Sequence, residues 1–227
     1  MTPARGDHDA RRSEVSEGVW RVLSARGFEG LTLRAVAAEL GASTGLLTHY
    51  FPNKRALLSH ALEELDRRSA DRPRRMAPAD GSAPPPAGLA RLRAALLDVL
   101  PLDEATESGN RIWVSSWDIA LADPELAAAH AGRYARSRVA LTGHVADAQR
   151  LGELPVGADP AGLAAAAQAF VLGLVVQSLF APAEFPAERQ TALLDAYLAG
   201  LAGLAGLAGS VGSAGSADGT GSAGSAG

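Results

Sequence analysis

The chain of 227 residues contains no cysteine, 5% aromatic residues and a single lysine, Lys54. The absence of cysteine excludes disulfides, thiolate metal sites and cysteine nucleophiles. A continuous membrane-spanning run is also missing, because the longest apolar stretch, residues 163–179, is interrupted by Gln168, Gly173 and Gln177. The first 17 residues are polar and charged, unlike a secretory signal. We therefore expect a cytoplasmic protein without a membrane segment.

Motifs of common enzyme classes are absent as well. The sequence has no HExxH zinc motif, no nucleotide-binding glycine loop after a strand and no serine on a nucleophile elbow. His130 and His144 have no partners at metal-ligand spacing. We therefore predict no metal site, no cofactor and no catalytic residues, and expect that the protein is not an enzyme.

Strand patterns are nearly absent, whereas Ala, Leu, Arg and Glu are abundant and Gly and Pro separate the segments. The sequence therefore predicts an all-α protein. The predicted helices cover, approximately, residues 12–26, 33–40, 43–50, 54–68, 89–100, 108–121, 124–151, 160–180 and 186–201.

Charge is unevenly distributed along the chain. Residues 1–75 hold 13 Arg and Lys against 10 Asp and Glu, a formal charge of +3, within a chain of net charge −4. The remainder is therefore at −7. A basic N-terminal part followed by an acidic remainder fits contact with DNA at one end of the molecule only.

The segment 31–58 has the spacing of two short helices that cross tightly. Gly41 can adopt the left-handed conformation that ends the first helix. Ser43 is a predicted N-cap that leaves the amides of the next helix free to face a phosphate. Small and apolar residues would hold the pair together: Val36, Ala37, Leu40 and Leu47. The pattern favours a helix-turn-helix over an ordinary helical hairpin.

The run RGFEGLTLRAVAAELGASTGLLTHYFPNKRALL resembles the N-terminal domain of the TetR family of transcriptional regulators. The resemblance implies contacts with base edges or phosphates for Thr44, Thr48, His49 and Tyr50, and a phosphate contact for Lys54. Thr48 departs from the family, in which an aromatic residue usually stands at this position and contacts a phosphate. That contact is therefore in doubt in this chain.

The later runs RIWVSSWDIALADPELAAAHAGRYARSRVAL and AFVLGLVVQSLF are similar to the sensor domain of the BetI-like branch of this family. The resemblance covers about residues 12–200. It implies a homodimeric repressor that binds a near-palindromic double-stranded DNA operator and is released by a small-molecule effector. The alternative is an all-helical small-molecule-binding protein or enzyme without a DNA role.

These patterns divide the chain into five parts. The predicted parts are a flexible N-terminal arm (1–11), a helix-turn-helix DNA-binding domain of three helices (12–71), a proline-rich linker (72–88), a helical sensor and dimerisation bundle (89–208) and a disordered Gly/Ala/Ser tail (209–227).

The individual DNA-contact candidates each have a second interpretation. A cation in the first turn of a helix opposes the helix dipole, which favours a phosphate beside Lys54 over simple solvation. Tyr50 is expected to lie partly in the core and to donate to a phosphate. Arg34 either reaches a phosphate or is solvated. The predicted DNA-binding residues are Arg34, Ser43, Thr44, Gly45, Thr48, His49, Tyr50 and Lys54.

Trp113 and Trp117 are four residues apart and so share one face of a continuous helix. They belong either to the core or, with Tyr134 and Phe170, to the wall of a pocket for an apolar or cationic effector. The arginines Arg133, Arg136 and Arg138 are expected to form a solvated helix face.

The last two long helices carry more apolar surface than a small bundle needs. Family resemblance places the dimer interface there. Its predicted residues are Phe170, Leu174, Leu193 and Tyr197, with Ala165, Ala169 and Gly173 allowing close approach.

Overall fold

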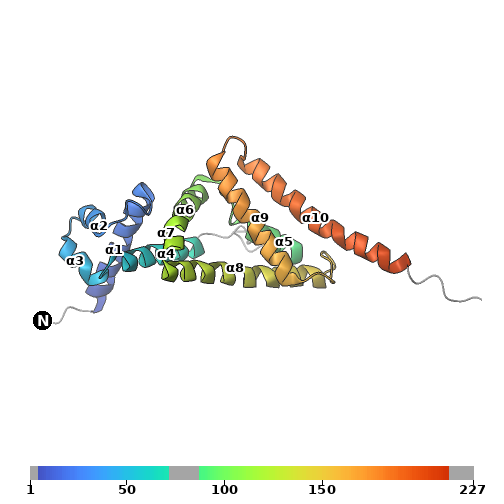
Figure 1. Ribbon diagram of the computed structural model, residues 1–227, viewed down its shortest axis with the longest axis horizontal. Helices are drawn as coiled ribbons and strands as arrows, with labels where there is room; N and C mark the ends of the chain where they lie inside the picture. The colour runs from blue at the N-terminus through green and yellow to red at the C-terminus, as the bar shows by residue number, and fades with distance from the viewer. Residues whose placement is uncertain (1–4, 72–86, 215–227) are drawn as a thin grey trace, which may run out of the picture.

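The computed structural model describes residues 5–71 and 87–214. These residues contain ten helices and no strands, as the sequence predicts (Figure 1). The helices are α1 (Arg5–Arg26), α2 (Leu33–Glu39), α3 (Thr44–Tyr50), α4 (Lys54–Asp71), α5 (Gly88–Leu97), α6 (Glu104–Ser115), α7 (Trp117–Ala122), α8 (Pro124–Arg150), α9 (Pro160–Phe180) and α10 (Ala187–Ala214).

Helices α1 to α4 gather at one end of the molecule, and α5, α8, α9 and α10 make up the other end (Figure 1). Helix α4 runs from the first group toward the second and contacts both α1 and α6. Helix α8 packs along α5, α7 and α9. Helices α4 and α8 therefore join the two ends.

The α2–α3 pair forms because local side chains complete the backbone hydrogen bonds at each helix start. The Thr32 hydroxyl accepts from the amide of Ala35 at 3.0 Å, and the Ser43 hydroxyl accepts from Leu46 at 3.2 Å. Gly41 takes φ +61°, the left-handed conformation that the turn requires. The predicted helix-turn-helix is therefore confirmed.

The buried apolar residues form two clusters, and the division between them does not coincide with the division between α1–α4 and the rest of the chain. The first contains the core of α1 to α4, and it also includes Ile112 of α6, Ala120 of α7 and Leu126 of α8. The second fills the space among α5, α8, α9 and α10. The end formed by α1 to α4 therefore shares its core with the middle of the chain.

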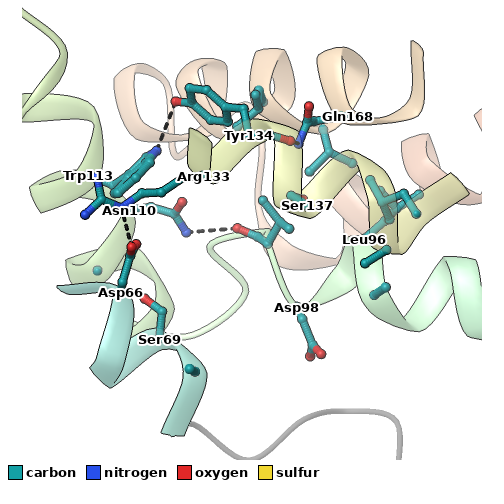
Figure 2. Close-up of a pocket in the computed structure, with 18 of the residues that line it drawn as sticks. Asp66, Ser69, Leu96, Asp98, Asn110, Trp113, Arg133, Tyr134, Ser137 and Gln168 are labelled. Carbon is teal, nitrogen blue, oxygen red and sulfur yellow. Dashed lines mark hydrogen bonds and ion pairs between the residues drawn. The ribbon is translucent and has the colours of Figure 1, made fainter. Parts of the chain in front are cut away.

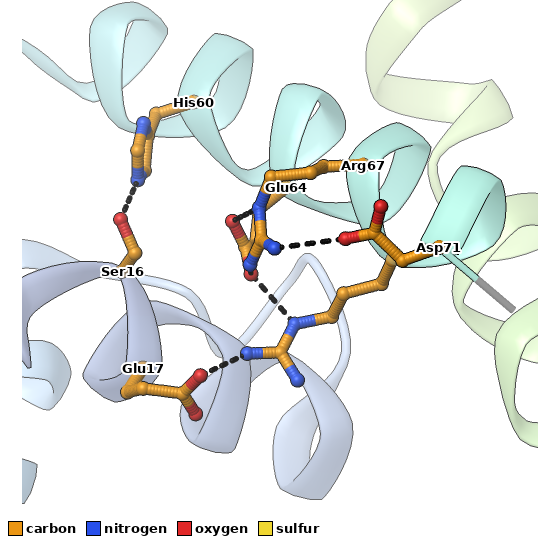
Figure 3. Close-up of polar contacts among 7 residues, drawn as sticks. Ser16, Glu17, His60, Glu64, Arg67 and Asp71 are labelled. Atoms are coloured by element: carbon orange, nitrogen blue, oxygen red, sulfur yellow. Dashed lines mark hydrogen bonds and ion pairs between the residues drawn. The ribbon is translucent and has the colours of Figure 1, made fainter. Parts of the chain in front are cut away.

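Charged groups hold α1 against α4 (Figure 3). The Glu64 side chain is 5% exposed and accepts from Arg67 at 2.5 Å and from Arg68 at 2.6 Å. Arg68 also pairs with Glu17 of α1, and its guanidinium lies 4.5 Å from the ring centroid of Trp20. Burial raises the pKa of Glu64, but these two guanidinium partners outweigh it and hold that pKa below its usual value.

Several helix boundaries differ from the sequence predictions, and three of these differences bear on the predicted parts of the chain. Helix α1 begins at Arg5, so residues 5–11 are helical rather than a flexible arm, with Arg11 paired to Glu14 one turn on. Helix α10 continues to Ala214, because Ala and Leu favour helix strongly enough to offset the intervening glycines. Residues 209–214 are therefore assigned to α10. The rest of the predicted arm and tail, and linker residues 72–86, lie outside the described residues.

The third difference is an interruption at Ser116, where one helix was predicted over 108–121. The Ser116 hydroxyl donates to the carbonyl of Trp113 at 2.6 Å and lies 3.2 Å from Nε2 of His130. Ser116 is buried and lies between the end of α6 and the start of α7. Trp113 and Trp117 consequently belong to different helices.

Helix α9 alone among the described helices is long and apolar enough to cross a bilayer by length and composition. It packs instead against α5, α6, α8 and α10, and seven of its residues are buried there. Its apolar character is thus accounted for in part by the core of the second cluster.

Candidate DNA-binding surface and effector cavity

The predicted DNA-contact residues lie on α2, on α3 and its N-cap, and at the start of α4. All are exposed except Tyr50, which is half-buried and packs on the first cluster. The exposed residues are Arg34, Ser43, Thr44, Gly45, Thr48, His49 and Lys54. Leu47, on the opposite side of α3, is fully buried. The helix therefore presents one polar, uncovered face.

Short side chains line that face. The Thr48 hydroxyl donates to the carbonyl of Gly45 at 2.8 Å, so its proton is already engaged. Gly45 leaves open space, because an added Cβ would meet only the Ser43 hydroxyl at 3.8 Å. Such a surface can approach a groove closely, and Lys54 adds a cation at the start of α4.

A cavity of about 560 Å³ lies between α4, α5, α6, α8 and α9 (Figure 2). That volume is within the usual range for small-molecule sites. Its walls are mainly apolar, with Leu96 and Val99 from the α5 end, Leu141 from α8 and Val171 from α9. Helix α4 contributes Leu65, Asp66, Ser69 and Ala70.

Polar groups concentrate at the α6 end of the cavity (Figure 2). The Trp113 indole donates to the Tyr134 hydroxyl at 3.2 Å. Arg133 pairs with Asp66 of α4, and its guanidinium lies 5.6 Å from the Trp113 ring centroid. His130 lies 4.6 Å from the same ring. These contacts fix Trp113 between a cation and an imidazole.

Burial sets the protonation of the two titratable rings in the cavity wall. It raises the pKa of Tyr134, opposed by the indole N–H groups of Trp113 and Trp117. It lowers the pKa of His144, with Arg91 acting in the same direction and Asp147 opposing it. Both side chains are therefore neutral near pH 7.

Two of the four predicted effector-binding residues line this cavity, and two do not. Trp113 and Tyr134 are part of its wall. Trp117 follows the interruption at Ser116 and lies outside the wall. Phe170 instead stacks on Tyr197 of α10, with ring centroids 4.3 Å apart and planes 8° from parallel. The proposed four-ring pocket is therefore not assembled.

The polar lining of the cavity includes residues that the sequence analysis did not assign to it. Arg133, expected on a solvated face, has a side chain that is 10% exposed. Asn110 donates to the carbonyl of Val99 at 3.0 Å, and Gln168 donates to that of Tyr134 at 3.2 Å. In the sequence, the one signal of this polar lining was Gln168, which interrupts an apolar run. A polar side chain on a buried helix face needs a hydrogen-bond partner.

The predicted interface residues also divide into two groups. Leu174 is 3% exposed and lies within the second cluster, so its side chain is not available to another subunit. Phe170, Leu193 and Tyr197 are half-buried and pack against that cluster from outside.

The outer faces of α9 and α10 are lined by small exposed residues. On α9 these are Gly162, Ala165, Ala166, Ala169 and Gly173, and on α10 they are Ala192, Ala196, Ala199, Gly200 and Gly203. Phe180 at the end of α9 is 83% exposed. A face of this kind permits close contact between helices.

Known families match most of the described chain. Residues 88–203 match the BetI-type transcriptional repressor C-terminal family, and residues 17–61 match the tetR family of bacterial regulatory proteins. The transcriptional regulator PksA of Bacillus subtilis is 32% identical over 111 residues, 49% of this chain and 52% of the relative. The regulator BetI of Burkholderia mallei is 29% identical over 126 residues, 55% of this chain and 62% of the relative. The matched regions thus span about half to three fifths of these relatives.

Solved structures share the fold over a greater length. A transcriptional regulator from Rhodococcus sp. Rha1 has a TM-score of 0.67 at 24% identity, covering 83% of this chain and 94% of that one. A putative regulator from Saccharomonospora viridis, solved in complex with choline, has a TM-score of 0.71 at 21% identity, covering 84% and 96%. The helix-turn-helix geometry and the match across the C-terminal half lead to one conclusion. The chain is not an enzyme but belongs to the TetR family of DNA-binding transcriptional regulators, with a C-terminal domain of the BetI type.

Proposed function

We propose that this protein is a cytoplasmic, ligand-responsive repressor that binds a near-palindromic operator as a homodimer. In this proposal the exposed face of α3 enters the major groove of each half-site, while Lys54 and Arg34 contact phosphates. The outer faces of α9 and α10 form the dimer interface, with Phe170, Leu193 and Tyr197 at its margin.

The observation that carries the proposal is that α4 belongs to both functional regions. Its first residue, Lys54, follows the α3 face directly, and its last two turns supply Leu65, Asp66, Ser69 and Ala70 to the cavity. An effector in the cavity therefore touches the helix that positions the DNA-binding surface. To release DNA, it must bind the DNA-incompetent state about a hundredfold more tightly, or about 3 kcal/mol.

The lining of the cavity supports an effector with an apolar body. Aliphatic side chains from α4, α5, α8 and α9 form a large part of the wall. A cationic effector is the less favoured alternative, because His130 and Arg133 already lie against the Trp113 ring that would have to receive it. Phe170 stacks on Tyr197 instead, and Trp117 is not part of the cavity wall.

A footprint on the DNA upstream of the protein's own gene tests the DNA-binding part of this proposal. We expect protection of two half-sites related by a dyad, with affinity that falls steeply as salt rises because bound counterions are released. Binding to a single half-site, or affinity independent of salt, would contradict the proposal. Failure to bind DNA at all would favour the alternative of a helical ligand-binding protein.

A further inference from the structure

The corner of the cavity formed by α4 and α8 contains a carboxylate and a buried guanidinium. Asp66 is paired with Arg133, and Nη2 of Arg136 lies 3.8 Å from the same carboxylate. Among the described residues, the Asp66 carboxylate thus faces two guanidinium groups, of which that of Arg133 is buried and that of Arg136 is 72% exposed. The Asp98 carboxylate, farther along the cavity, is already engaged in an interaction of its own.

Arg133 also has an unused donor. Its Nε donates to Asp66, whereas its Nη1 is buried and has no acceptor among the described residues. The whole side chain is 10% exposed, so solvent does not readily replace that acceptor. A buried donor without a partner is costly, more so when it carries charge. An arginine presents its donors in a planar fork that suits a carboxylate.

On this basis, and resting on the proposed effector function, we propose that the cavity binds an amphipathic carboxylate. Its acidic head contacts the guanidinium of Arg133, which lines the cavity, and its apolar body lies against Leu96, Leu141 and Val171. The head supplies an acceptor and a negative charge to the buried guanidinium of Arg133. A quaternary amine would instead place a second cation beside Arg133, which is unfavourable in a site of low dielectric.

The same contact provides a route to α4. The effector carboxylate and Asp66 compete for one guanidinium, and Asp66 retains Arg136 as a second partner. Binding therefore weakens the Asp66–Arg133 pair that joins α4 to α8 at the cavity end of α4. Residue 66 is on the same helix as Lys54, so the loss of this pair loosens the support of the DNA-binding surface.

Three probes that share one alkyl chain test the head-group preference: decanoate, decanol and decyltrimethylammonium. Their affinities are measured on the DNA-free dimer by calorimetry or Trp fluorescence. We expect decanoate to bind at least about tenfold more tightly than either of the others. A preference for the amine, equal affinity for all three, or no binding by any would overturn the inference.

Substitution of the charged groups tests the location. We expect Arg133→Met to weaken decanoate about tenfold or more while decanol binding is retained. Asp66→Asn removes the competing charge and should strengthen decanoate severalfold. Arg150→Met is the matched control, since Arg150 is on the same helix, 72% exposed and outside the cavity. Should Arg133→Met fail to fold, Arg133→Lys keeps the charge but not the fork, and is also expected to weaken decanoate.

Operator release is measured separately on the same variants. Decanoate that binds through Arg133 without releasing DNA would support the head-group inference and contradict the proposed ligand response. Release by another compound, unaffected by Arg133→Met, would support the ligand response and overturn the head-group inference. The two proposals therefore fail in distinguishable ways.

Discussion

Arg55, in the first turn of α4, donates to the carboxylate of Asp123 at 2.8 Å. The same carboxylate is the N-cap of α8, where it accepts from the amides of Glu125 at 3.0 Å and Leu126 at 3.3 Å. One side chain therefore both starts α8 and ties it to the first turn of α4. Together with the Asp66–Arg133 pair, it attaches α4 to α8 near both ends of α4.

This arrangement gives a pH-dependent contribution to stability. Burial raises the pKa of Asp123, but the two capping amides and Arg55 outweigh it and hold that pKa below its usual value. A lowered folded pKa means that the stabilisation is complete above the unfolded value, about 3.9, and is lost as pH falls through the folded value. We expect carbon NMR titration to place the Asp123 transition below that of an ordinary aspartate. Arg55→Met should move it upward, whereas Arg111→Met, which removes a cation distant from Asp123, should leave it unchanged.

The exposed positions of Lys54 and Thr44 predict different effects on DNA binding. Lys54→Ala should weaken all sequences about equally and reduce the slope of log affinity against log salt by about 1 per subunit. Thr44→Ala should instead change which bases are preferred in the half-site. Competition binding over a range of salt concentrations measures both effects. Equal losses of base preference from the two substitutions would mean that their roles are assigned wrongly.

Gly45 offers a way to separate folding from DNA binding. Since an added Cβ has room, Gly45→Ala should leave the fold intact and stabilise α3 by up to about 1 kcal/mol. The added methyl stands on the surface that faces DNA, so operator affinity should fall. Gly143→Ala, at an exposed and equally open position in α8, is the control and should leave DNA binding unaltered. Undiminished operator affinity in Gly45→Ala would place this part of α3 away from DNA.

Exposed and buried residues of α9 predict different effects of substitution, the first on dimer formation and the second on stability. Ala169 is exposed among small residues, so Ala169→Arg should yield a folded monomer in sedimentation experiments. Leu174 is core, so Leu174→Ala should lower the free energy of unfolding by about 2–5 kcal/mol. Val139→Arg, on an exposed site of α8, controls for the added charge and should remain dimeric. A dimeric Ala169→Arg protein would place the interface on another face.

The helix-turn-helix was predictable from sequence because its determinants are local. Thr32 and Ser43 accept the amide three residues further on, and Gly41 supplies the turn between them. Each of these signals operates within four residues. The predicted bounds of α2 and α3 accordingly agree with the structure to within one residue.

The cavity was less predictable because its determinants are distant in sequence. Asp66 and Arg133 are 67 positions apart, and nothing near Arg133 distinguishes it from a solvated arginine. The Ser116 hydroxyl lies against His130 of another helix, and the interruption at Ser116 places Trp113 and Trp117 in two helices rather than one. Local patterns carry no information about such contacts.

The sharing of one core between the DNA-binding end and the middle of the chain has a consequence for protein engineering. A chimera joined after Asp71 would separate Leu57 and Leu65 from the side chains of Ile112, Ala120 and Leu126 that complete their cluster. Its foreign partner would have to present matching apolar side chains at the equivalent places. A chimera of this protein should therefore include α6, α7 and the first turn of α8 together with α1 to α4. The part of the chain transferred to change operator specificity would then consist of two non-contiguous segments rather than one.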